Sequence, residues 1–238
     1  LACRSFLARG VMARSLSTLP PAVASWATCD PNTISGQNPA YGKNLVGGQW
    51  KETKEYAPIP DPMNGEPFIV QPNSSKEEMQ EFVDSMKLCS KSGLHNPLKN
   101  PERYTMYGQV SAKMGEMLEN EDVADYFTRL IQRTCPKSYA QAKGEITVTS
   151  RFLRNFSGDQ VRFMARGFMV SGDHCGQTSM AYRWPFGPVA IVSPFNFPLE
   201  IPALQLMGAL FMGNKVLLKN ATTTAMVMEQ FIRLGHYC

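Results

Sequence analysis

The chain has 238 residues, of which 43% are hydrophobic and 18% charged, and its formal net charge is +4. This is the composition of a globular protein with ample length for a core, and it excludes wholesale disorder. Three of the 24 basic residues, Arg4, Arg9 and Arg14, precede the first acidic residue, Asp30, so the other 21 nearly balance the 20 acidic residues. The body therefore lacks the basic excess that is typical of nucleic-acid binding.

Residues 1–29 carry arginine and serine but no acid, which is the composition of an organelle transit peptide. A secretory signal fits less well because Arg9 and Arg14 interrupt any apolar stretch. The three arginines, spaced five apart, lie about 140° from one another on a helix and so share no single face. The segment predicts a transit peptide, with a disordered arm as the alternative.

The cysteines and histidines form no recognisable cluster. The six cysteines are scattered without a CxxC pair, and dense disulfide bridging belongs to smaller secreted domains, so we expect reduced thiols. The three histidines are too dispersed to complete a metal site with them. A weakly charged stretch, Trp184 to Asn214, is interrupted by five prolines and cannot be one membrane-spanning helix.

Residues 30–72 are rich in Pro, Gly and Asn and predict an extended lead-in with strands at Asn44–Val46 and Phe68–Val70. A capping box formed by Ser75 and Glu78 then starts a helix that runs until Gly93. Its apolar residues follow helical spacing: Met79, Phe82, Val83, Met86 and Cys89.

Three further helices are predicted from caps and apolar periodicity. The first starts at Asn100 and Pro101, with a stripe of Tyr104, Tyr107, Val110, Met114 and Met117. The second follows Asn120 and ends at Pro136, with a stripe of Val123, Tyr126, Phe127, Leu130 and Ile131. The third runs from Lys137 to Phe156 and stops at Gly158. We assign these stripes to the core, because such stripes are packing surfaces far more often than cofactor sites.

After Gly158 the pattern becomes extended. Segments 161–170 and 178–184 flank GDHCGQ and predict a hairpin whose outer strand is free to pair with another chain. A β-α-β-α order follows: strand 189–193, helix 199–211, strand 215–219 and helix 224–234. Short apolar strands that alternate with helices predict a parallel sheet and an α/β fold, in which ligands collect at the carboxyl ends of the strands.

Two residues at these strand ends could carry chemistry. Asn196, in the loop between the first strand and its helix, has a side-chain amide that could donate to a developing oxyanion, although Asn is also a favoured helix cap. Lys219 ends the second strand and could bind a ribose hydroxyl or a phosphate, although a solvated lysine is the plainer interpretation. Neither GxGxxG nor GxxxxGK[ST] occurs.

The segment GPVAIVSPFNFPLEIPALQLMGALFMGNKVLLKN resembles the signature region of the aldehyde dehydrogenase superfamily. Upstream, LVGGQWKE, IPDPMNGEPFIVQP and NPERYTMYGQVSAKMGEMLE resemble the family's early strands and helices, so that the likeness covers roughly Asn44 to Leu234. It is strongest to the plant-type mitochondrial members that oxidise L-glutamate γ-semialdehyde (1-pyrroline-5-carboxylate) to glutamate in proline catabolism. One departure is Phe195, where many members have Trp.

The resemblance implies an aldehyde dehydrogenase-like α/β fold with a partial Rossmann-type parallel sheet, N-terminal helices and an oligomerisation arm. The expected division is a transit peptide at 1–29, the N-terminal part of an NAD-binding domain at 30–158, the arm at 159–184, and a β-α-β-α unit of the same domain at 185–238. The resemblance further implies a small aldehyde substrate, NAD as cofactor, a mitochondrial matrix location and a homo-oligomer when the protein is full-length.

The resemblance also implies roles for single residues. Asn196 matches the family's oxyanion-stabilising Asn, and Ser193, Pro194 and Phe195 match the loop on the nicotinamide side of NAD. Lys219 matches the Lys that binds the adenosine ribose. Thr222 stands where the family often has a Glu beside that ribose, which leaves the preference for NAD or NADP open.

The family's nucleophilic Cys and general-base Glu are expected beyond the last residue of this sequence. Cys175 and Cys238 have no base or oxyanion partner near them in sequence, and we expect neither to be catalytic. The chain is therefore expected to be the N-terminal portion of an NAD-dependent aldehyde dehydrogenase, inactive alone and poorly soluble. The alternatives are an inactive truncated subunit that acts only through oligomerisation, and an incomplete reading frame.

Overall fold

The computed structural model describes residues 19–89, 100, 102–158 and 166–238. The helices are α1 (Pro21–Ala24), α2 (Lys76–Lys87), α3 (Glu102–Glu119), α4 (Glu121–Thr134), α5 (Tyr139–Arg154), α6 (Glu200–Phe211) and α7 (Ala225–Tyr237). The strands are β1 (Ala40–Tyr41), β2 (Asn44–Val46), β3 (Gln49–Lys51), β4 (Tyr56–Pro60), β5 (Pro67–Pro72), β6 (Gly167–Ser171), β7 (Thr178–Tyr182), β8 (Pro188–Val192) and β9 (Lys215–Lys219). Within this part of the chain no helix is long and apolar enough to cross a membrane.

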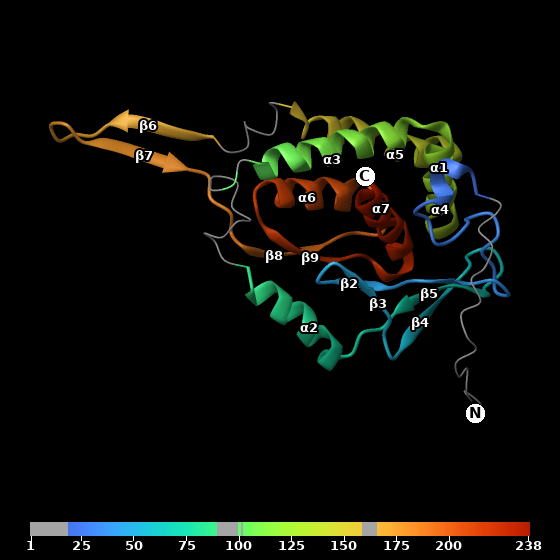
Figure 1. Ribbon diagram of the computed structural model, residues 1–238. Coiled ribbons are helices and arrows are strands. Elements are labelled where there is room, and N and C mark those ends of the chain that lie inside the picture. Colours follow the sequence, from blue (N-terminus) through green and yellow to red (C-terminus); the bar gives the residue numbers. More distant parts are fainter. Residues whose placement is uncertain (1–18, 90–99, 101, 159–165) are drawn as a thin grey trace.

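The predicted β-α-β-α unit is present. Strands β8 and β9 pair in parallel, in a register that runs from Pro188 opposite Lys215 to Val192 opposite Lys219. Helix α6 makes the crossover and covers one face of the pair, while α2 contacts β9 from the other side (Figure 1). The α/β class and the parallel pairing predicted from the sequence are confirmed.

The lead-in folds into small sheets. Strands β2 and β3 form a hairpin across Gly47 and Gly48, whose φ values of 58° and 78° suit a two-residue turn of the mirror-image type. Strand β5 pairs in parallel with β1 and antiparallel with β4, so that the order is β1-β5-β4. The strands expected at 44–46 and 68–70 are confirmed as β2 and as part of β5.

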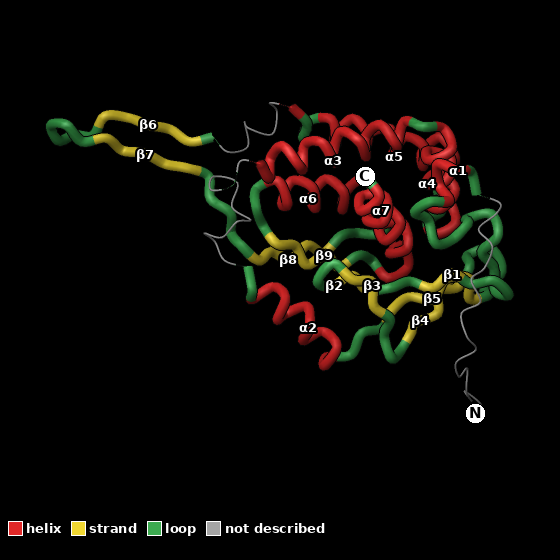
Figure 2. The backbone as a smooth tube through the Cα atoms, in the orientation of Figure 1, coloured by secondary structure: helices red, strands yellow, loops and turns green. Residues whose placement is uncertain are grey.

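Helices α3, α4 and α5 form the helical layer, to which α6 adds along α5 (Figure 2). The predicted stripe of α4 is buried throughout. On α3, however, the most buried positions include Gly108, Ser111 and Gly115, while most of the predicted stripe is only partly buried. These small residues let α5 approach closely: the Ser111 hydroxyl donates to the Leu153 carbonyl at 2.7 Å. The prediction that the large apolar stripe of α3 forms its core face is therefore corrected. Much of the buried face consists of small residues, and most of the large ones are only partly buried.

Helix α2 also departs from the prediction. Its capping box forms as expected, with Ser75 accepting from the Glu78 amide. None of its residues is buried, however, and Met79 and Val83 are 38% and 41% exposed. The apolar stripe of α2 therefore does not form part of the buried core, and α2 makes most of its contacts with β9 and β2. The predicted extension to Gly93 lies outside the described residues.

The hairpin of β6 and β7, which we call the arm, projects from the body (Figure 1). Its strands pair antiparallel from Gly167 opposite Tyr182 to Ser171 opposite Thr178. The side chains at its centre are exposed and apolar, with Phe168 at 61% and Met169 at 70%. The hairpin is confirmed, although residues 161–165 of its predicted first strand lie outside the described residues.

Residues 19–29, the described part of the predicted transit peptide, pack into the core. Val23 is fully buried and Trp26 is 7% exposed. The Trp26 indole stacks on Phe127 with ring centroids 5.5 Å apart and meets Tyr126 edge-on at 5.3 Å. The segment directly after α1 therefore packs against α4. In the fold described here, this segment is part of the folded body.

We expect Trp26→Ala to lower the free energy of unfolding by about 3–5 kcal/mol, because truncating a buried aromatic ring leaves a cavity in the core. Urea unfolding followed by circular dichroism would measure it. Trp184 is 46% exposed, so Trp184→Ala serves as the matched control and should change stability by less than about 1 kcal/mol. Equal losses in the two variants would contradict the assignment of residues 19–29 to the core.

Candidate functional site at the strand ends

The carboxyl ends of β8 and β9 meet at Ser193 and Lys219. The Ser193 amide donates to the Lys219 carbonyl at 3.1 Å, which extends the parallel ladder by one bond beyond Val192. The Ser193 hydroxyl donates to Asn220 Oδ1 at 3.0 Å, and Ser193 is buried. Both strand ends are thus locked together at the point where each strand leads into a loop.

The loop that follows Ser193 is open to solvent. Pro194, Phe195, Asn196 and Phe197 are all exposed, with Phe195 at 62%. The N-cap of α6 is Leu199, and no side chain of its own segment caps it. The alternative in which Asn196 caps this helix is therefore wrong, and no hydrogen bond occupies its amide among the described residues.

A carboxylate from another helix holds the start of α6. Glu145, on the buried face of α5, accepts from the amides of Leu199 and Glu200 at 2.7 Å and 3.0 Å through Oε2. Its other oxygen pairs with the Lys137 ammonium at 2.9 Å. Burial, and then the nearby Glu145 charge, raise the pKa of Glu200. Glu145 is not predicted from the sequence, although an acidic residue on an otherwise buried helix face is a signal that could have found it.

The same ammonium also reaches the loop. Lys137 Nζ lies 3.8 Å from the centroid of the Phe197 ring, which is close enough for a cation–π contact. Phe197 directly follows Asn196. The loop is therefore contacted by Lys137 at Phe197 and by Glu145 at the amides that begin α6. Lys137 is a second residue that the sequence analysis did not single out.

The second strand end offers a cation and a hydroxyl. Lys219 and Thr222 are both exposed, and within the described part of the chain no carboxylate pairs with the Lys219 ammonium. Thr222 begins a short 3-10 turn, Thr222–Thr224, that leads into α7. A free ammonium at a parallel strand end fits the hydroxyls or phosphates of a nucleotide cofactor, and a neutral Thr beside it repels neither. The residues present therefore fit a ligand that carries hydroxyl or phosphate groups, as a nucleotide cofactor does.

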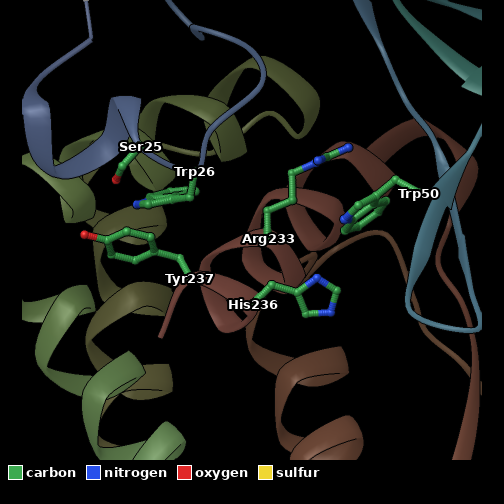
Figure 3. Close-up of a pocket in the computed structure, with 6 residues that line it drawn as sticks. All are labelled: Ser25, Trp26, Trp50, Arg233, His236 and Tyr237. Carbon is green, nitrogen blue, oxygen red and sulfur yellow. The ribbon is translucent and has the colours of Figure 1, made fainter.

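A cavity of about 230 Å³ lies at a different part of the fold (Figure 3). It is lined by Ser25, Trp26, Trp50, Arg233, His236 and Tyr237. The Arg233 guanidinium lies 3.9 Å from the Trp50 ring centroid and pairs with Glu229 at 2.8 Å. Because this cation is already neutralised by a buried carboxylate, the cavity offers no free charge to a ligand, and the strand ends remain the candidate site.

The family model described as aldehyde dehydrogenase family matches residues 50–237. The fold agrees: an NAD-dependent aldehyde dehydrogenase from Sinorhizobium meliloti superposes with a TM-score of 0.73 at 20% identity, over 87% of this chain and 40% of that one. An NADP-dependent glyceraldehyde-3-phosphate dehydrogenase from Bacillus halodurans, complexed with NADP, superposes with a TM-score of 0.66 at 24% identity, over 83% and 41%. The chain belongs to the aldehyde dehydrogenase family.

Two plant sequences are much more similar. A probable aldehyde dehydrogenase from Linum usitatissimum is 56% identical over 213 residues, which cover 90% of this chain and 39% of that protein. The mitochondrial delta-1-pyrroline-5-carboxylate dehydrogenase 12A1 of Arabidopsis thaliana is likewise 56% identical, over 90% of this chain and 38% of that protein. The chain thus spans about two fifths of the length of the curated relatives it matches.

The cysteines that the structure describes are all free thiols. Burial raises the pKa of Cys29 to about 12, only partly offset by the hydrogen bond with Tyr126. Burial also raises the pKa values of Cys135 and Cys238. These shifts are opposite to the lowered pKa of an activated nucleophile. Cys175, near the tip of the arm, is exposed.

We expect iodoacetamide at pH 8 to alkylate Cys175 at least about 100-fold faster than Cys29, because a thiol with a pKa near 12 is about one part in 10,000 thiolate at that pH. Raising the pH toward the pKa of Cys29 should increase its thiolate fraction and its labelling. Mass spectrometry of timed digests measures both rates. The denatured chain, in which both should react alike, is the control; equal rates in the folded chain would overturn the assignment.

Proposed function

We propose that this chain is the N-terminal part of a dehydrogenase that oxidises an aldehyde to a carboxylate with a nicotinamide cofactor. The observation that carries the proposal is the Asn196 amide at the carboxyl end of a parallel strand, which is exposed and makes no hydrogen bond to any residue that the structure describes. Amide donors held at such a position stabilise the oxyanion that develops when a nucleophile attacks a carbonyl. Membership of the aldehyde dehydrogenase family supports the same reaction class.

The family resemblance supplies a proposed role for each site residue. Asn196 donates to the aldehyde oxygen and so favours attack of a nucleophile on the aldehyde carbon. Ser193, Pro194 and Phe195 form the wall beside the nicotinamide, and Lys219 binds the adenosine ribose. The cofactor, when bound, supplies the hydride acceptor. NAD is proposed as the cofactor on the family resemblance. Thr222 bears no charge, so no acid at this position repels the 2′-phosphate of NADP, and the preference between NAD and NADP stays open.

The proposed substrate is L-glutamate γ-semialdehyde, the open form of 1-pyrroline-5-carboxylate, and the proposed location is the mitochondrial matrix. Both rest on the 56% identity with the Arabidopsis protein whose name states that substrate and organelle. A malonate-semialdehyde dehydrogenase from Geobacillus kaustophilus is 30% identical over 81% of this chain and 38% of that protein. A leader that is removed on import would end before Leu19, because Val23 and Trp26 belong to the core.

Opposite kinetic signatures are expected from Asn196 and Lys219 in the full-length protein. Asn196→Ala should lower kcat about 10²–10³-fold because it removes an oxyanion donor. Lys219→Met should instead raise the KM for NAD about 10-fold while kcat changes little, because it removes a bond made equally in the ground and transition states. Steady-state rates of NADH formation with the semialdehyde measure both.

Lys143 is an exposed lysine on α5 and provides the control, since Lys143→Met should leave both constants unchanged. Full activity of Asn196→Ala would contradict the proposed role of Asn196. An unchanged KM for NAD in Lys219→Met would remove Lys219 from the cofactor site.

The arm supports a second role, in subunit association, whether or not the chain is catalytic. Met169 and Met180 lie opposite each other in the arm and are 70% and 57% exposed. A projecting two-stranded ribbon with exposed apolar side chains is a template for pairing with another chain. We propose that the segment 159–184, which contains this arm, serves oligomerisation and that the full-length protein is a homo-oligomer. Residues 30–158 and 185–238, with the packed segment 19–29, are proposed to form the cofactor-binding domain.

Replacing Met169 and Met180 with Lys should lower the mass of the full-length protein in solution to that of a smaller assembly, because the interface would have to bury two charges. Light scattering coupled to size exclusion measures the mass. Met63 is 88% exposed on the turn between β4 and β5, and Met63→Lys is the matched control that should keep the native mass. An unchanged mass in the double variant would show that the arm does not hold the subunits together.

A further inference from the structure

The loop that carries Asn196 is anchored at both ends, by different parts of the fold. At its start, Ser193 is fixed to Lys219 and Asn220 by the strand-end hydrogen bonds. At its end, the amides of Leu199 and Glu200 donate to Glu145. We infer that Glu145 is a positioning residue that sets the place of the Asn196 amide; this inference rests on the proposed function of Asn196.

A carboxylate suits this position for electrostatic reasons. The first amides of an α-helix have no partner within the helix, and the helix dipole makes that end positive, so a negative acceptor stabilises it. Glu145 supplies one oxygen to two of these amides, and its side chain is fully buried. A buried carboxylate needs a counter-charge, which Lys137 provides with a side chain only 13% exposed.

The ion pair between Glu145 and Lys137 also contacts the loop. We call Glu145, together with the two amides and the ammonium that it binds, the clamp. Lys137 bonds to Glu145 through the same ammonium that lies over the Phe197 ring. Removing the Glu145 carboxylate would therefore free two helix amides and also release the cation from its place beside Phe197. Both effects act on the residues that directly follow Asn196.

The position of Asn196 within the loop shows why loss of the Glu145 carboxylate should displace its amide. It lies three residues after Ser193 and three before Leu199, so each anchor is within about 10 Å of backbone. A loop held at two such points has few conformations, and without the Glu145 hydrogen bonds its second end is held only by the packing of Leu199 and α6, so that more conformations become accessible. Displacement of a reacting group by about 1 Å can cost about 100-fold in rate.

The test compares Glu145→Ala and Glu145→Gln in the full-length protein. Alanine removes the acceptor, whereas glutamine keeps one oxygen for the amides but loses the charge. We expect kcat to fall about 100-fold in Glu145→Ala and about 10-fold in Glu145→Gln, while the KM for the aldehyde changes less than about threefold. Hydrogen exchange should accelerate at the Leu199 and Glu200 amides, again more in Glu145→Ala.

Glu229 provides the matched control. It too is buried, accepts from one backbone amide, that of Lys43 at 2.9 Å, and pairs with a basic side chain, Arg233, but it lies on α7 away from the loop. Glu229→Gln should destabilise the fold to a similar degree and leave both kcat and the exchange at Leu199 unchanged. A loss of kcat that merely follows stability would appear in this variant as well.

Faster exchange together with the graded loss of kcat supports the positioning role. Unchanged exchange at Leu199 and Glu200 in Glu145→Ala overturns the clamp, and faster exchange with an unchanged kcat overturns its influence on Asn196. Asn196→Ala is measured in parallel: if it keeps full activity, the proposed function of Asn196 fails first, and the positioning inference fails with it. The exchange data distinguish that failure from a failure of the clamp itself.

Discussion

One buried carboxylate joins the two halves of this fold. Glu145 belongs to the helical layer, yet its hydrogen bonds go to the first amides of α6, the helix that crosses over from β8 to β9. Since α6 packs on both strands, the position of the parallel pair relative to α3, α4 and α5 depends on this contact and on the packing of α5 against α6. The proposed site lies at the strand ends beside that junction, so its geometry is inherited from the helical layer.

Local patterns predicted most of the elements because each signal lay within a few residues. The capping box at Ser75, the proline after α4 and the β-α-β-α alternation depend on short-range chemistry, and the helices and strands follow them. The Gly47-Gly48 pair was an equally local hairpin signal that the analysis did not use. Asn196 and Lys219 could be placed at one edge of the sheet for the same reason: parallel strands end on the same side.

Contacts between distant segments could not be read in this way. An apolar stripe predicts that a helix face is buried, but not that the small residues of α3 are buried. These residues allow close contact with α5, in which the Ser150 hydroxyl donates to the Gly115 carbonyl at 3.0 Å. The amphipathic pattern of α2 likewise does not indicate that few other elements pack against this helix. Glu145 was overlooked because its partners, Lys137 aside, lie more than fifty residues away, where sequence spacing carries no information about distance.

Burial divides the molecule into a dense half and an open half, and this division bears on where motion can occur. In the helical half Val123, Phe127, Leu130 and Ile131 are inaccessible to solvent, and Trp26 closes the core over them. In the strand pair, Val192 is 75% exposed, although it directly precedes the buried Ser193. Local opening is easiest where few apolar contacts are lost. The strand ends are therefore held by the two hydrogen bonds of the buried Ser193 on one side and on the other by α6, from whose first amides Glu145 accepts.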